Sequence, residues 1–321
     1  MDKLTNKLQL IEEGLKSFIS KNKDIKALLS IGSYSQGAFD SFSDMDLFVF
    51  TDKPADYMSW DDATWAEPLG KIISRRVFRD RGDGVDKNKL VTETGIMYDL
   101  TFVPMNHLRV IRFYLGLKRR NLQFLLPGFL KNGIGTAVAR FYDTIKRGCH
   151  IHHDTIGLGK IVPYLRAAYS QQSPVFPDKK AFANSYNNFW QSCYTASVKL
   201  TKGEYYHNLL LYDNYMKHQL LRAMEWLAIT DDPSVDVFFN GARLQQWGPH
   251  DVYERILPTL FHDDVLEMQY CLLRSAALYQ ELSAALAQAY GFALNKQFEA
   301  FVINFIEHTA IPYTRRRLSK V

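Results

Sequence analysis

Apolar residues recur at helical spacing in the first twenty residues of the chain. Leu4, Leu8, Ile11, Leu15 and Phe18 stand three or four positions apart, so they share one face of a helix. The pattern predicts an amphipathic helix that ends near residue 21.

Short and almost wholly apolar runs follow, and they predict a sheet. The second run is apolar at nearly every position, as expected of a strand that is buried on both faces. Thr94-Gly95 parts the last two runs, which favours a hairpin between them. The predicted strands cover residues 25–31, 45–50, 89–93 and 96–103.

Helical periodicity dominates from about residue 155 onward. Before that point we expect one more helix over residues 107–118 and a last edge strand over residues 138–143. We therefore predict an α+β N-terminal domain (a mixed sheet flanked by helices) in residues 1–150, followed by an all-α helical-bundle domain in residues 151–321. The predicted helices of the second domain cover residues 182–200, 205–227, 252–260 and 265–290.

The composition narrows the class of protein. Hydrophobic residues make up 47% and charged residues 23% of the chain, which allows large buried cores and argues against disorder. The net charge of +5 suits a polyanionic ligand such as a nucleoside triphosphate, but it is too weak and too dispersed for duplex DNA. We interpret the basic run Arg315-Arg316-Arg317 as a solvated tail.

Cysteine usage and the N-terminal sequence favour a cytoplasmic protein. The cysteines Cys149, Cys193 and Cys271 are far apart and odd in number, so no disulfide framework is expected. The N-terminus does not have the pattern of a signal peptide, and no apolar run approaches the length of roughly 18 residues that a membrane span needs. We expect no contact with a membrane.

Two aspartates at the start of the second predicted strand are the first candidates for chemistry. Asp44 and Asp46 are two positions apart, so their side chains point to the same face. Carboxylates this close repel each other, and a divalent cation between them removes the repulsion. A lone pair of this kind also occurs in ordinary polar turns, so its surroundings decide how it is interpreted.

Those surroundings favour a phosphate and metal site. Gly32-Ser33 ends the preceding predicted strand, and a glycine there lets backbone N–H groups and the Ser33 hydroxyl approach phosphate oxygens closely. A third carboxylate, Asp99, lies within the later run 96–103. If its strand neighbours that of Asp44 and Asp46, three carboxylates meet in the arrangement of a two-magnesium site.

This joint pattern resembles the signature of the polymerase-beta-like nucleotidyltransferase superfamily, and within it the antibiotic nucleotidyltransferases. Residues 40–46, 98–104, 187–190 and 221–226 are similar to stretches of the aminoglycoside 6-adenylyltransferases, which modify streptomycin. Residues 202–205 and 279–282 are similar to the lincosamide nucleotidyltransferases. The likeness covers most of the chain, and its N-terminal motif is the most specific part.

The resemblance implies a Mg²⁺-dependent transfer of a nucleoside monophosphate, AMP from ATP or another nucleotide, to a hydroxyl of an aminoglycoside or lincosamide, with release of pyrophosphate. It implies two Mg²⁺ ions on Asp44, Asp46 and Asp99, and it allows a homodimer. The implied catalytic residues are Asp44, Asp46, Asp99 and Glu204, and the implied nucleotide-binding residues are Gly32, Ser33, Asp44, Asp46, Lys199 and Lys202.

The acceptor side has alternatives at each position. The proton acceptor is Asp99 or Glu204, although Glu204 also suits a plain helix N-terminus and the lysines suit plain solvent exposure. A cationic acceptor could be lined by Glu204, Asp213, Glu225 and Tyr206. The chain departs from the 6-adenylyltransferases in having Tyr34 for an arginine, Asn188 for a glutamate and Leu210 for an acidic residue.

Two other functions remain as hypotheses. The basic balance and the C-terminal arginines would suit a nucleotidyltransferase that acts on RNA or protein. The replacements at Asn188 and Leu210 would suit an inactive nucleotide-binding homologue. The histidine-rich residues 147–154 fit no zinc spacing, and we interpret them as a linker between the domains.

Overall fold

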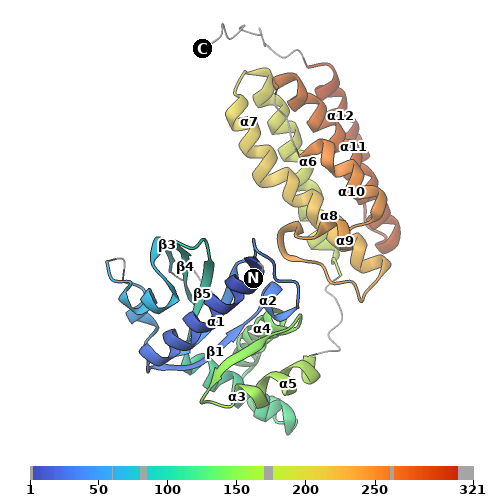
Figure 1. Ribbon diagram of the computed structural model, residues 1–321. Helices are drawn as coiled ribbons and strands as arrows, with labels where there is room; N and C mark the ends of the chain where they lie inside the picture. Colours follow the sequence, from blue (N-terminus) through green and yellow to red (C-terminus); the bar gives the residue numbers. More distant parts are fainter. Residues whose placement is uncertain (1–2, 60, 80–84, 170–175, 261–263, 310–321) are drawn as a thin grey trace, which may run out of the picture. The chain divides into compact units, whose positions relative to one another are not determined.

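The computed structural model describes residues 3–59, 61–79, 85–169, 176–260 and 264–309. The chain divides into two compact units, Met1–Gln172 and Ser173–Val321, shown in Figure 1. The predicted order, an α+β domain followed by a helical domain, is confirmed. The division falls after residue 172 rather than after residue 150, because β6 (His150–Asp154) and α5 (Leu158–Tyr169) complete the first unit.

The N-terminal unit is built on a six-stranded sheet with the order β3-β4-β5-β2-β1-β6. The central strands β2 and β5 are parallel, and all other neighbours are antiparallel. The strands that precede β6 are β1 (Ile25–Ser30), β2 (Met45–Thr51), β3 (Ile72–Phe78), β4 (Asp86–Thr92) and β5 (Met97–Pro104).

Helical segments cover both faces of this sheet. On one face Phe18, Leu47 and Phe102 are buried in a core beneath the first helix. On the other face Leu29 and Phe50 are buried in a second core. The first face carries α1 (Lys3–Lys21) and the 3₁₀ segments η1 (Pro54–Tyr57) and η2 (Thr64–Leu69); the second carries α3 (Met105–Arg119), α4 (Gly128–Ile145) and α5, with η3 (Gln123–Leu125) between α3 and α4.

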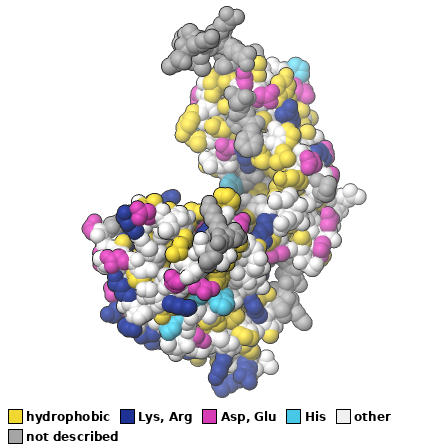
Figure 2. Space-filling model, in the orientation of Figure 1, with side chains coloured by type: hydrophobic (Ala, Val, Ile, Leu, Met, Phe, Trp, Pro, Cys, Tyr) yellow, Lys and Arg dark blue, Asp and Glu magenta, His cyan; other side chains and the backbone are white. Residues whose placement is uncertain are grey.

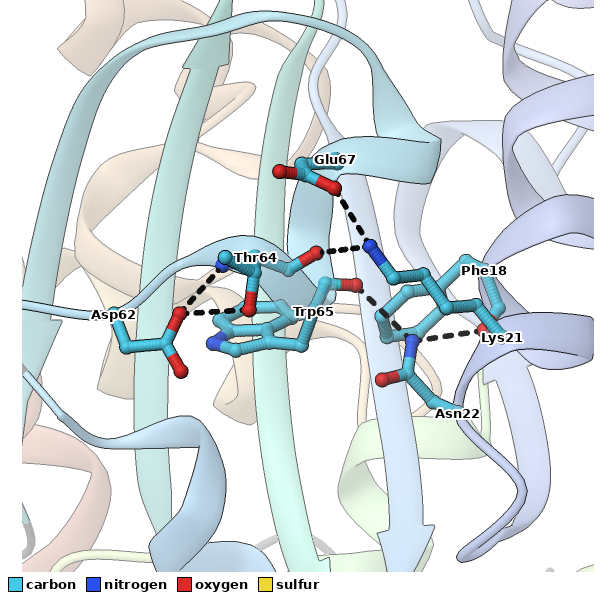
Figure 3. Close-up of polar contacts among 7 residues, drawn as sticks. All are labelled: Phe18, Lys21, Asn22, Asp62, Thr64, Trp65 and Glu67. Carbon is cyan, nitrogen blue, oxygen red and sulfur yellow. Dashed lines mark hydrogen bonds and ion pairs between the residues drawn. The ribbon is translucent and has the colours of Figure 1, made fainter.

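Polar contacts fix the C-terminal end of α1 against η2, as Figure 3 shows. Lys21 Nζ donates to the Thr64 carbonyl at 2.6 Å and pairs with Glu67 at 2.7 Å. Asn22 Nδ2 donates to the Trp65 carbonyl at 3.0 Å. These contacts therefore anchor the C-terminal end of α1 to η2.

Two predicted elements of this unit were wrong. Residues 138–143 are helical within α4. Val138 and Ile145, which are seven positions apart, are buried on the same face of this helix. Residues 150–154 are not a linker, because they pair with β1 as the edge strand β6. One strand, β3, was not predicted at all.

The C-terminal unit is a helical bundle with a core rich in aromatic side chains. The Phe189 and Tyr279 rings stack with centroids 3.8 Å apart. Buried Glu299 is satisfied by the Tyr186 hydroxyl at 2.6 Å and by Lys296 at 2.8 Å. The elements are α6 (Lys179–Thr201), α7 (Tyr205–Leu211), the π-helical η4 (Tyr212–Met216), α8 (Lys217–Asp231), η5 (Phe239–Gly241), α9 (Leu244–Trp247), α10 (His250–Ile256), η6 (Leu257–Thr259), α11 (Val265–Tyr290) and α12 (Lys296–Glu307).

Three remaining features of the sequence can be placed. Cys149, Cys193 and Cys271 are all free thiols. Within the described ranges, no helix is both long enough and apolar enough to cross a membrane. The arginine run 315–317 lies outside the described residues. On the face drawn in Figure 2, basic side chains are interspersed with acidic and apolar ones.

Candidate active site

The centre of the sheet places the predicted aspartates together. Asp46 lies directly opposite Asp99 in the parallel pairing of β2 with β5. Asp44 comes one residue before β2 and two before Asp46, so it lies on the same side of the strand. Met45 and Leu100 are buried in the core under the other face, and strand alternation therefore turns the aspartates away from that core.

The three carboxylates influence one another electrostatically. Burial raises the pKa of Asp46 to about 7, and the negative charges of Asp44 and Asp99 add to the rise. Lys89 and Lys87 oppose it. A carboxyl with this pKa is half protonated near neutral pH, so a cation that binds here stabilises the charged form.

A lysine that the sequence analysis missed completes the row. Lys89 on β4 lies opposite Asp99 on β5, and its Nζ is 3.1 Å from Asp99 Oδ2. The hydrogen bond to Asp99 raises the pKa of Lys89, as does its attraction to Asp44 and Asp46. No sequence motif points to Lys89, because its role depends on the pairing of β4 with β5.

The remaining oxygen of Asp99 provides the test of whether a metal fits. Asp99 Oδ1 is buried and has no hydrogen-bond partner among the described residues, which is costly unless a ligand or ion satisfies it. In the described part of the chain, no three His, Cys, Asp or Glu side chains are already drawn in around a metal position. The carboxylate oxygens, including the unpartnered Asp99 Oδ1, are hard ligands of the kind that Mg²⁺ prefers. If the carboxylates moved together around an ion, the contact between Lys89 and Asp99 would weaken.

The Gly32 turn lies directly over the Asp46 carboxylate. Gly32 has φ +69°, and a Cβ added there would lie 2.4 Å from Asp46 Oδ2. The N–H of Ile31 donates to the Asp46 carbonyl at 3.1 Å, which ties the turn to β2. Ser33 follows within the short helix α2 (Gly32–Ser35). Only glycine allows both this backbone conformation and this approach to the carboxylate.

The loop that leads into Asp44 is held in shape before any ligand binds. Asp40 Oδ1 accepts hydrogen bonds from the N–H and hydroxyl of Ser43, at 2.7 and 2.8 Å. Lys7 Nζ on α1 donates to the carbonyls of Ser41 and Ser43 at 3.0 and 2.6 Å. The position of Asp44 is therefore set by α1 and by a local turn.

Aromatic and imidazole rings lie beside the Gly32 turn. The Tyr34 ring centroid is 5.6 Å from those of Phe39 and His152. His152 Nε2 is 2.9 Å from the Ser30 hydroxyl, and burial lowers the pKa of His152 to about 4. The histidines of β6 thus form part of the wall beside the turn, with His152 as a neutral imidazole.

Comparison with known proteins decides the class of enzyme. Residues 11–113, which contain Gly32, Asp44, Asp46 and Asp99, match the family model of the nucleotidyltransferase domain. The chain is a nucleotidyltransferase. Residues 159–309 of this nucleotidyltransferase match a second family model, that of streptomycin adenylyltransferase.

Solved structures and curated proteins provide two further comparisons. An aminoglycoside 6-adenyltransferase from Bacillus subtilis, known from a crystal structure, matches the nucleotidyltransferase with 16% sequence identity and a TM-score of 0.41, over 92% of this chain and 96% of that chain. No curated protein matches the chain. The assignment therefore rests on the two family models.

The helical unit of the nucleotidyltransferase holds the other predicted residues in a cluster of its own. Lys199 Nζ is 2.7 Å from Glu204 Oε2, and His207 Nδ1 is 3.6 Å from the same oxygen. The hydrogen bond from Lys199 lowers the pKa of Glu204. Lys202 follows α6 as an exposed residue. Glu204 is thus an ion-paired carboxylate at the start of α7.

The proposed lining of a cationic acceptor is only partly available. Asp213 is paired with Lys217 at 2.6 Å, one turn along the helix. Glu225 is partly buried, and this burial raises its pKa. Tyr206 is 75% exposed and is the most accessible of the four candidates. An acceptor that used Asp213 or Glu204 would have to compete with a lysine.

Proposed function

We propose that this nucleotidyltransferase transfers AMP from ATP to a hydroxyl of an aminoglycoside, in a Mg²⁺-dependent reaction that releases pyrophosphate. The observation that supports it most is the register of β2 and β5, which sets Asp46 opposite Asp99 with Asp44 beside them. The match of the helical unit to streptomycin adenylyltransferase supports the aminoglycoside as acceptor, and lincosamides are the second class to test.

Asp44, Asp46 and Asp99 would hold the metal ions. Bound Mg²⁺ would polarise the acceptor hydroxyl and neutralise charge on the triphosphate and the leaving pyrophosphate. Asp99, whose buried Oδ1 has no hydrogen-bond partner among the described residues, would hold a metal ion or accept the proton of the acceptor hydroxyl. Lys89 Nζ, 3.1 Å from the other oxygen, would hold the Asp99 carboxylate in position.

The Gly32 turn would hold the triphosphate. Its first N–H groups open the helical turn α2 and have no partners within it. The close approach of Gly32 to Asp46 would bring phosphate oxygens next to the metal-binding carboxylates. Lys89 would then approach the phosphates from the side of β4. Its ammonium group would stabilise the negative charge that develops on them during transfer.

The test is mass spectrometry of aminoglycosides and lincosamides incubated with the full chain, Mg²⁺ and each of the four ribonucleoside triphosphates. Pyrophosphate release is followed in parallel. Asp46→Asn is the inactive variant, and Asp52→Asn is its matched control, because Asp52 lies just after the same strand and only approaches Arg109 at 3.9 Å.

The expected result is a mass gain of one AMP on an aminoglycoside, kept in Asp52→Asn and lost in Asp46→Asn. A gain on lincosamides alone would correct the acceptor class. Pyrophosphate release with no modified antibiotic would leave the transfer chemistry standing and move the acceptor to RNA or protein. Folded wild-type protein without either signal would contradict the proposal.

A further inference from the structure

A cavity of about 340 Å³ lies on the N-terminal unit between α1, the start of β1 and the end of β6. It is away from the row of carboxylates, since it meets β1 at the end opposite to Gly32. No acidic side chain of the described residues lines it. Its polar lining consists of Lys16, Ser20, Lys23, Lys26, His153 and Thr155.

Three lysines from different elements line this cavity. Lys16 belongs to α1, Lys23 to the turn after it and Lys26 to β1. None of the three ammonium groups has a hydrogen-bond or ion-pair partner among the described residues. Lys21, on the same helix, shows the contrast, because it is fully engaged by η2 (Figure 3).

Carboxylates close by in the sequence are occupied elsewhere. Asp24 accepts a hydrogen bond from the Tyr57 hydroxyl at 2.8 Å. Asp154 accepts the N–H groups of Ile156 and Gly159 at 3.0 and 2.9 Å. Among the described residues, neither carboxylate forms an ion pair with a lysine of the cavity.

The floor of the cavity is fixed by paired backbone. The N–H and hydroxyl of Thr155 both donate to the Lys26 carbonyl, at 2.9 and 2.8 Å. His153 pairs with Leu28 in the ladder between β6 and β1. Because Lys26 and His153 come from strands that are already hydrogen-bonded, a ligand would not have to order the backbone that carries them.

We propose that this cavity, the tri-lysine cavity, binds a small phosphate-bearing anion, either inorganic pyrophosphate or the phosphate group of a nucleotide. Ammonium groups that share one cavity repel each other, and a multiply charged anion converts that repulsion into charge-assisted hydrogen bonds. Ser20 adds a hydroxyl donor. Lys26 and Gly32 are six positions apart, roughly 20 Å in extended chain, so the tri-lysine cavity is separate from the triphosphate turn.

The experiment measures binding of pyrophosphate and of AMP to the full chain by isothermal titration calorimetry, in EDTA so that no divalent ion assists the carboxylate site. The cavity variant is the triple substitution Lys16→Gln, Lys23→Gln, Lys26→Gln. The matched control is Lys53→Gln, Lys131→Gln, Lys160→Gln, which removes the same charge from exposed positions outside the cavity.

The cavity variant is expected to bind the preferred anion about tenfold more weakly or worse, while the control stays close to wild type. Tighter binding of pyrophosphate identifies a polyphosphate site, and tighter binding of AMP identifies a nucleotide site. If both triple variants bound the anion equally weakly, the loss would be due to net charge alone and the proposal would be overturned. Failure of the wild type to bind either anion would also overturn it.

A second measurement does not depend on the variants folding. The wild type is acetylated with and without the anion, and the modified lysines are located by peptide mass spectrometry. We expect protection of Lys16, Lys23 and Lys26 and none of Lys53. Unprotected cavity lysines at a saturating anion concentration would contradict the proposal.

Discussion

Asp46 and Asp99 lie opposite each other on two adjacent parallel strands, and Asp46 has a Gly32 turn directly over its carboxylate. The pair brings two negative charges to a partly buried position, where the pKa of Asp46 rises to about 7. An arrangement that costs stability in the free protein persists where function requires it.

Replacing Asp46 by Asn should separate function from stability. If Asp46 is a metal ligand as proposed, its loss is expected to reduce nucleotidyl transfer by about 10³-fold or more. Loss of its buried charge should at the same time raise the free energy of unfolding of the metal-free protein at pH 8. Product formation and urea denaturation of the same preparation check both effects. A variant that lost activity together with stability would indicate a structural role instead.

The contribution of Asp46 to the stability of the metal-free protein should fall as the pH rises from about 4 to about 7. The folded pKa of Asp46 is about 7, whereas an unfolded aspartate titrates near 3.9. Within this window the folded state binds a proton at Asp46 that the unfolded state does not, so this contribution to the free energy of unfolding decreases with pH, by an amount of order 4 kcal/mol at most.

The contribution of Asp46 is isolated as the difference between wild type and Asp46→Asn, measured by denaturation in EDTA at several pH values. The two curves should diverge above about pH 4 and run parallel above about pH 8. Mg²⁺ should reduce the gap at pH 8, because the ion stabilises the charged carboxylates. Parallel curves over the whole range would mean that Asp46 titrates normally in the folded protein.

Lys89→Met should impair catalysis without unfolding the chain. Removal of the ammonium 3.1 Å from Asp99 is expected to raise KM for ATP and to lower kcat by about tenfold or more. It should also lower the Mg²⁺ concentration needed for half-maximal rate, because the carboxylates lose a competing cation. The matched control is Lys71→Met, which breaks the exposed pair with Glu93. Wild-type kinetics and metal dependence in Lys89→Met would remove Lys89 from the site.

Gly32→Ala and Gly37→Ala form a matched pair of substitutions in and after the Gly32 turn. Both glycines have φ close to +70°, but only the Gly32 methyl would meet Asp46, since no atom of the described residues lies within 4 Å of a Cβ at Gly37. Both variants should lose about 1–2 kcal/mol of stability to backbone strain. Only Gly32→Ala is expected to lose nucleotidyl transfer, measured as pyrophosphate release. Equal activity of the two variants would contradict the close approach.

The sequence was informative where chemistry and periodicity coincide. The spacing of Asp44 and Asp46 at the start of an apolar run placed both on one face of a strand, and Asp99 fell on a second apolar run. The sequence alone could not show that those two strands are neighbours. The structure shows it, because β2 pairs with β5.

The elements that were missed have weak apolar patterns. Only Val77 is buried in β3, and β6 is polar at four of its five positions, so neither has the alternation that marks a half-buried strand. Each is an edge strand that exists because its neighbour offers backbone hydrogen bonds. Lys89 was missed for a related reason, since its partner Asp99 is defined by strand register and not by spacing along the chain.

The late position of β6 has a consequence for how the chain is made. β1 is complete by residue 30, but the strand that covers its outer edge comes from residues 150–154. While the chain emerges from the ribosome, β1 must therefore wait with unpaired N–H and C=O groups for more than a hundred residues, and such an edge is a template for pairing with other chains. A fragment that stops at residue 149 would keep this edge permanently, and it should aggregate even though every aspartate of the site is present.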